Sequence, residues 1–75
     1  MNKLQRKVLD EIVEKLESIR NDLEGLNSEE QDKFDNLPES LQESDRGRAL
    51  EANADLLDYV VSDIESVINS LSEVE

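Results

Sequence analysis

The chain has 75 residues and contains neither cysteine nor histidine, which excludes disulfides, thiolate metal sites and the commonest zinc ligands. Its 8 Lys and Arg residues stand against 20 Asp and Glu residues. The formal net charge is therefore -12, and a surface of that sign repels nucleic acid and anionic membranes.

The spacing of apolar residues predicts an all-α fold in a single domain, residues 1–75. A first helix is predicted over residues 3–24, starting from the good N-cap Asn2. It is expected to stop at Gly25, which can take the left-handed conformation that ends a helix. Its apolar residues alternate in steps of three and four: Leu9, Ile12, Leu16, Ile19, Leu23 and Leu26.

Residues 25–44 are predicted to form a short, partly helical middle segment. Residues 28–31 have the pattern of a capping box, which starts a helix, and Pro38 disfavours helical geometry at the residue before it. Asn36 is a second predicted cap, with Pro38 in the tolerant first turn. We expect the apolar residues of this segment to cover one end of the helix pair as a structural plug: Phe34, Leu37, Pro38 and Leu41.

The last helix is predicted over residues 45–73, with Ser44 or Asp45 as its N-cap. Its apolar residues follow a heptad spacing, which is typical of a helix that buries one stripe against a partner. The predicted stripe comprises Leu50, Leu57, Val60, Ile64, Val67, Leu71 and Val74. The two long helices are therefore expected to pair as an antiparallel hairpin.

Two other residues of the last helix stand out. Asn53 falls in the stripe where an apolar residue is expected, and two readings are open. It either lies at the edge of the stripe and bonds to the middle segment, or it fixes register or oligomeric state from within. Tyr59, beside Val60, is expected to be a half-buried packing residue.

Further apolar residues widen the face of both helices, which implies more than one neighbour. We expect a homodimer in which two hairpins pack as a four-helix bundle. A monomer with a shallow groove, or a groove for a helix of another protein, are the alternatives. The expected dimer face comprises Val8, Ile12, Val13, Val61, Ile64 and Ile68.

No catalytic pattern is present, so we expect neither an enzyme nor a cofactor. Without His or Cys, the available bases and nucleophiles are carboxylates, lysines and Tyr59. Asp32, Asp35 and Glu39 are read as a solvated acidic surface rather than a metal site, because the EF-hand pattern is missing. No apolar run approaches the ~20 residues that span a bilayer, and a signal-peptide core is lacking. We expect a cytoplasmic protein without membrane contact.

Residues 29–47 read Glu-Glu-Gln-Asp-Lys-Phe-Asp-Asn-Leu-Pro-Glu-Ser-Leu-Gln-Glu-Ser-Asp-Arg-Gly. An aromatic residue before Asp-Asn-Leu-Pro-Glu, then Leu-Gln, Ser and Gly, between two acidic helices, resembles a family of small acidic helical proteins encoded by phages and prophages. The likeness covers the whole layout of the chain. It implies a phage-type accessory protein in the cytoplasm of a bacterial host, within a family that has no assigned activity.

Acidic residues also suggest a mode of action. Residues 49–75 contain no Lys or Arg, and Glu51, Asp55 and Asp58 share one helix face. We expect this face to occupy a basic, nucleic-acid-binding surface of a host or defence protein and so to inhibit or modulate it. An acidic surface that serves only solubility is one alternative. A structural or adaptor module that binds another protein through its apolar groove or dimer face is the other.

Overall fold

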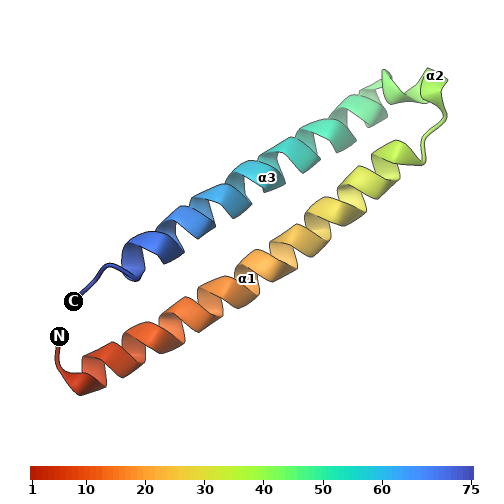
Figure 1. The fold of residues 1–75 in the computed structure, drawn as a ribbon. Coiled ribbons are helices and arrows are strands. Elements are labelled where there is room, and N and C mark those ends of the chain that lie inside the picture. The colour runs from red at the N-terminus through yellow and green to blue at the C-terminus, as the bar shows by residue number, and fades with distance from the viewer.

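The computed structural model describes residues 1–75 and contains three helices, α1 (Lys3–Asp35), α2 (Glu39–Gln42) and α3 (Asp45–Leu71). The long helices α1 and α3 lie side by side and antiparallel, with α2 in the connection at one end and both termini at the other (Figure 1). This arrangement confirms the predicted all-α class and the helical hairpin.

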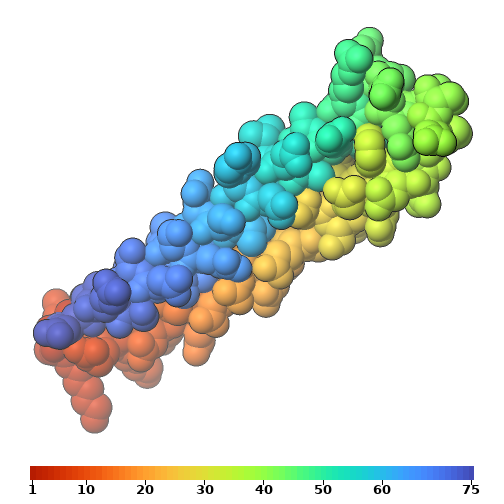
Figure 2. Space-filling view, turned by 45° about the horizontal axis from the view of Figure 1, so that its top comes forward, coloured from red at the N-terminus to blue at the C-terminus, as the bar shows by residue number.

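The hairpin is a thin rod. Its extents are 59 × 15 × 12 Å, and its radius of gyration of 17.3 Å exceeds the value of about 11 Å for a compact domain of this length. Figure 2 shows the two long helices in contact along the rod, with the N-terminal and C-terminal residues together at one end. The α-amine of Met1 donates a hydrogen bond to the backbone oxygen of Glu75 at 2.9 Å.

Helix α1 begins as predicted but runs past its predicted end. Asn2 forms a reciprocal capping box with Gln5, with hydrogen bonds of 2.7 and 3.1 Å. Gly25 lies inside the helix without a positive φ, so neither the predicted stop there nor a new start at residues 28–31 occurs. The weak helix propensity of one glycine is outweighed because the next two turns pack against α3.

The connection between the long helices is shorter than the predicted middle segment. Asn36 is the C-cap of α1, and its N–H donates to the carbonyl oxygen of Asp32 at 2.9 Å, so Asn36 does not start a helix as predicted. Pro38 is the N-cap of the single-turn α2 and offers no side-chain bond. Ser44 caps α3 as predicted, because its hydroxyl accepts from the backbone N–H of Gly47 at 3.3 Å.

The helices meet along one line of half-buried and buried residues, which we call the inner seam. Its buried apolar members are Leu50, Ala54 and Val61. The seam comprises Leu9, Val13, Leu16, Arg20, Leu23, Asn27, Glu30 and Phe34 of α1 with Gly47, Leu50, Ala54, Leu57, Val61, Ile64, Ile68 and Leu71 of α3. It repeats in steps of three and four residues, as a coiled coil requires.

The inner seam corrects two predictions. Val60 and Val67 of the predicted stripe lie outside it, whereas Ala54 and Ile68, which the predicted stripe does not contain, lie within it. Four residues of the predicted dimer face therefore pack inside the hairpin and are not free for a second molecule: Val13, Val61, Ile64 and Ile68. Ala54 is buried on this line, and its small side chain suits a close approach of α3 to α1.

Candidate interaction surfaces

The hairpin has two sides along its length, and shallow grooves between the helices show which residues belong to each. One groove is lined by Leu26, Glu30, Asn53, Leu56 and Leu57. The other is lined by Asn27, Ser28, Gln31, Asp32, Ala54, Asp55 and Asp58. Residues seven apart on a helix point in nearly the same direction, with a drift of about 20°. Each side can therefore be followed along the rod from the residues of its groove.

The side of Gln31 and Asp58 carries rows of carboxylates. Steps of seven from Gln31 reach Glu24, Glu17 and Asp10 on α1, and steps from Asp58 reach Glu51 and Glu65 on α3. We call this surface the acidic face: Asp10, Glu17, Glu24, Glu51, Asp55, Asp58 and Glu65, all exposed. None of these residues forms an ion pair, since the only ion pair of the hairpin joins Lys33 to Glu30. Asp10 lines a hollow with Lys3, Arg6 and Lys7, so cations lie near the N-terminal end of the face. The α3 part of the face has no cation after Arg48.

The three residues expected to bind a partner all lie exposed on α3. Asp55 and Asp58 line one groove together with Asp32, so carboxylates of both helices meet there. Asp58 also accepts a hydrogen bond of 2.9 Å from the Nδ2 atom of Asn27. Glu51 lies seven residues before Asp58 and continues the same row.

Tyr59 is the residue of this region that the sequence prediction misplaced. Its side chain is 71% exposed rather than half-buried, and it lines a shallow hollow with Asp55, Asp58 and Ser62. The signal was available in the sequence, because Tyr59 lies two residues from both Leu57 and Val61. Positions two residues from the seam in both directions point away from it.

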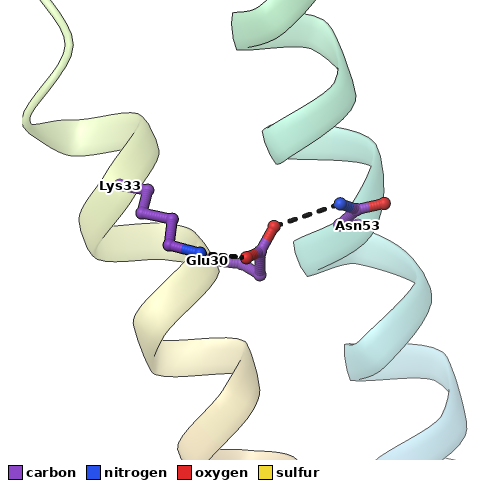
Figure 3. A network of polar contacts seen from close by, with 3 residues as sticks. All are labelled: Glu30, Lys33 and Asn53. Atoms are coloured by element: carbon purple, nitrogen blue, oxygen red, sulfur yellow. Dashed lines mark hydrogen bonds and ion pairs between the residues drawn. The ribbon is translucent and has the colours of Figure 1, made fainter.

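The opposite side contains a polar network next to the seam (Figure 3). The Nδ2 atom of Asn53 donates to one carboxylate oxygen of Glu30 at 3.1 Å, and the Nζ atom of Lys33 donates to the other at 3.0 Å. Both hydrogen bonds hold the pKa of the Glu30 carboxyl below its ordinary value, and the bond from Asn53 has the larger effect. Asn53 is exposed and bonds to a residue of the range 25–44, so the reading that places it at the edge is confirmed.

Beyond the polar network, this side is apolar. Ile12, Ile19 and Leu26 follow one another at seven-residue steps on α1, and Val60 and Val67 follow Asn53 at the same step on α3. We call these five residues the outer apolar stripe; they are between 42% and 50% exposed. Val8, the other exposed residue of the predicted dimer face, lines a groove with Met1, Leu4 and Ile12 at the N-terminal end of the stripe.

The distinctive middle motif is part of the turn. Phe34 and Leu37 are half-buried, but Pro38 and Leu41 are exposed, so only the first two act as the predicted plug. The Nε2 atom of Gln42 donates long hydrogen bonds of 3.4 and 3.5 Å to the carbonyl oxygens of Leu37 and Phe34. These contacts give the motif a structural role at the closed end of the hairpin.

No group of three or more potential metal ligands occurs, and no helix combines the length and apolar character needed to cross a membrane. Comparisons with protein-family models, with curated proteins and with solved structures each find no match to this chain.

Proposed function

We propose that the chain is a protein-binding module whose acidic face occupies a basic, nucleic-acid-binding surface of a partner protein. In the setting that the phage-like motif implies, the partner is a host or defence protein that is inhibited or modulated. The observation that carries the proposal is the acidic face itself, in which rows of carboxylates from both helices lie on one side without ion pairs. A basic partner would gain from neutralising charges that the hairpin leaves unpaired.

The spacing of these carboxylates supports a phosphate-like pattern. Along the α3 axis Glu51, Asp55 and Asp58 follow one another at steps of about 6 and 4.5 Å, from a rise of 1.5 Å per residue. One strand of duplex DNA places phosphates about every 3.4 Å along its axis. The three carboxylates thus present one charge for every one to two phosphates, which a surface built for nucleic acid can bind.

Tyr59 supplies an anchor beside these charges. Tyrosine is enriched among the residues that dominate binding energy, and its ring can receive an arginine guanidinium on its face. Its 71% exposure leaves the ring free for that contact, next to Asp55 and Asp58. An arginine-rich site would therefore meet carboxylates and an aromatic ring together.

The test compares two triple variants that lose the same charge. Partners are first captured from a bacterial lysate with the wild-type chain, and binding is then measured over a series of salt concentrations. Glu51→Gln, Asp55→Asn and Asp58→Asn remove charge from the acidic face. The amide oxygen at position 58 can still accept the Asn27 hydrogen bond. The control changes exposed residues of α1 away from that face: Glu11→Gln, Asp22→Asn and Glu29→Gln.

We expect the first variant to lose at least about tenfold in affinity at low salt, with the difference shrinking as salt screens the charges, while the control stays near wild type. If both variants bind as tightly as the parent at low salt, the acidic face is only a solvated surface. The proposal would then fail.

The outer apolar stripe favours a second candidate function, an adaptor that binds another protein through apolar contacts. Such binding would survive both high salt and the amide substitutions, because burial of apolar surface is not screened. Loss of capture on changing Ile19 and Val67 to Glu, with no effect of the amide variant, would identify the adaptor.

A further inference from the structure

We propose that a second copy of this chain covers the outer apolar stripe, so that two hairpins form an antiparallel four-helix bundle. Their acidic faces then point outward on opposite sides of the bundle. This inference keeps Ile12 of the dimer face expected from the sequence and replaces the four residues of that face that pack inside the hairpin. It does not depend on the proposed function.

The surface area of the hairpin supports a missing neighbour. The 8.5 kDa chain exposes 5762 Å², whereas a folded monomer of that mass exposes about 4,700 Å². The excess of roughly 1,100 Å² is somewhat more than the ~800 Å² that each partner buries in a standard interface. One copy on one side of the rod would remove about that excess.

The interior of a single hairpin is also thin. Only Leu50, Ala54 and Val61 are buried apolar residues, and the α1 half of the seam includes the polar Arg20, Asn27 and Glu30. Chains of this size seldom stabilise themselves with one core of that kind. The stripe offers apolar residues in a second line parallel to the seam, which is the pattern that four-helix bundles use.

The distribution of charge favours a second copy over an unrelated partner. The chain carries a net charge of -12, which opposes self-association, but the outer apolar stripe contains no charged residue. Packing stripe against stripe keeps the two acidic faces as far apart as the bundle allows. The outer apolar stripe has one row of residues on each of two antiparallel helices. A two-fold axis therefore places each row of one copy against a row of the other copy.

Two features select an antiparallel dimer in one register. The polar network of Glu30, Lys33 and Asn53 bounds the stripe at the loop end, so two stripes overlap fully only when they are centred on one another. Ile19 lies midway along α1, so a perpendicular two-fold axis there superimposes the stripes. It also separates the two acidic loop ends and places each beside the basic residues at the start of α1, Lys3, Arg6 and Lys7.

The first test is the mass in solution, measured by light scattering from low to high micromolar concentration. We expect the wild-type chain to reach twice 8.5 kDa, and Ile19→Glu with Val67→Glu to remain helical and monomeric. The control is Ser18→Glu with Ser66→Glu, which adds the same charges one residue away on each helix, at exposed positions off the stripe. The control should dimerise like the wild type.

A wild-type monomer at high micromolar concentration would overturn the proposal and leave the stripe to another protein. A stripe variant that still dimerises would also overturn it.

A second measurement is informative even if the stripe variant unfolds. The chain has no cysteine, so Ser40→Cys in the loop can carry a single spin label on an otherwise unchanged protein. In the antiparallel dimer the two labels lie at opposite ends of a rod 59 Å long, and a short distance between them would overturn this arrangement.

Discussion

Gly47 shows how one missing side chain sets the closed end of the hairpin. A Cβ atom at this position would lie 2.1 Å from the carbonyl oxygen of Gln42 and 2.8 Å from that of Leu41. Both are backbone atoms that cannot move without displacing α2. Gly25, by contrast, lies in the exposed middle of α1 with nothing within 4 Å of a Cβ.

The same substitution should therefore have opposite effects at the two glycines. We expect Gly47→Ala to lower the free energy of unfolding by about 1–3 kcal/mol through overpacking. Gly25→Ala should raise it by about 0.5–1 kcal/mol, because alanine is the better helix former. Thermal unfolding followed by circular dichroism measures both changes. Equal effects of the same sign would contradict this account of Gly47.

Glu30 makes stability depend on pH in a definite direction. Its pKa is lowered in the folded state by hydrogen bonds from Asn53 and Lys33, so its ionised form stabilises the fold. That contribution is complete above the ordinary glutamate pKa of about 4.5 and is lost as the pH falls through the lowered value.

The measurement compares wild type with Glu30→Gln, whose amide keeps the shape and does not titrate. We expect the wild type to be the more stable above about pH 4.5, and its advantage to shrink below that pH. Acid has the same general effect on both proteins, so the difference between their free energies of unfolding reports the Glu30 carboxyl alone. A difference that does not change between pH 7 and pH 3 would show that the network does not act through the Glu30 carboxylate.

At the scale of the elements, Phe34 joins the end of α1 to the turn. Its side chain is half-buried at the end of the inner seam, and its carbonyl oxygen accepts a bond from Gln42. Removing a buried Phe side chain costs about 3–5 kcal/mol, and partial burial places Phe34→Ala near or below the lower end of that range. Urea unfolding of Phe34→Ala and of Leu41→Ala measures the cost. Because Leu41 is exposed, Leu41→Ala should change the free energy of unfolding very little. An equal loss of stability in both variants would contradict the conclusion that Leu41 is not part of the plug.

The elements also show what the sequence could and could not predict. Local caps at Asn2 and Ser44 were readable because each satisfies backbone donors within its own turn. The end of α1 was not, because the continuation through Gly25 depends on contacts with α3. The choice of seam was ambiguous for a geometric reason. The line of Leu57, Ile64 and Leu71 belongs to two possible stripes, and both have steps of three and four.

The same distinction, between features set within one helix and features set by contacts between helices, applies to the candidate surfaces. The acidic row on α3 could be read from Glu51, Asp55 and Asp58 alone, because they lie on one helix. The matching row on α1 could not, because it depends on the rotation of α1 against α3. The rotation that buries Leu50, Ala54 and Val61 leaves Val60 and Val67 exposed.

At the scale of the whole molecule, the rod separates its surfaces by direction rather than by position along the chain. The acidic face and the outer apolar stripe each draw residues from both long helices, and each runs beside the inner seam. The two proposed binding surfaces would therefore not compete with one another, because they lie on different sides of the hairpin. In the proposed dimer this gives two acidic faces on one bundle, and a partner with two basic sites would bind with increased avidity.

The meeting of the two chain ends has a topological consequence. The Met1 amine and the Glu75 backbone oxygen are 2.9 Å apart, so a linker of a few residues could join the ends into a closed ring. New ends could then be opened at the exposed residues around Ser40, at the far end of the rod. Such a circular permutant would keep both long helices whole while reversing their order. A label or tether attached to it would leave from the opposite tip of the molecule.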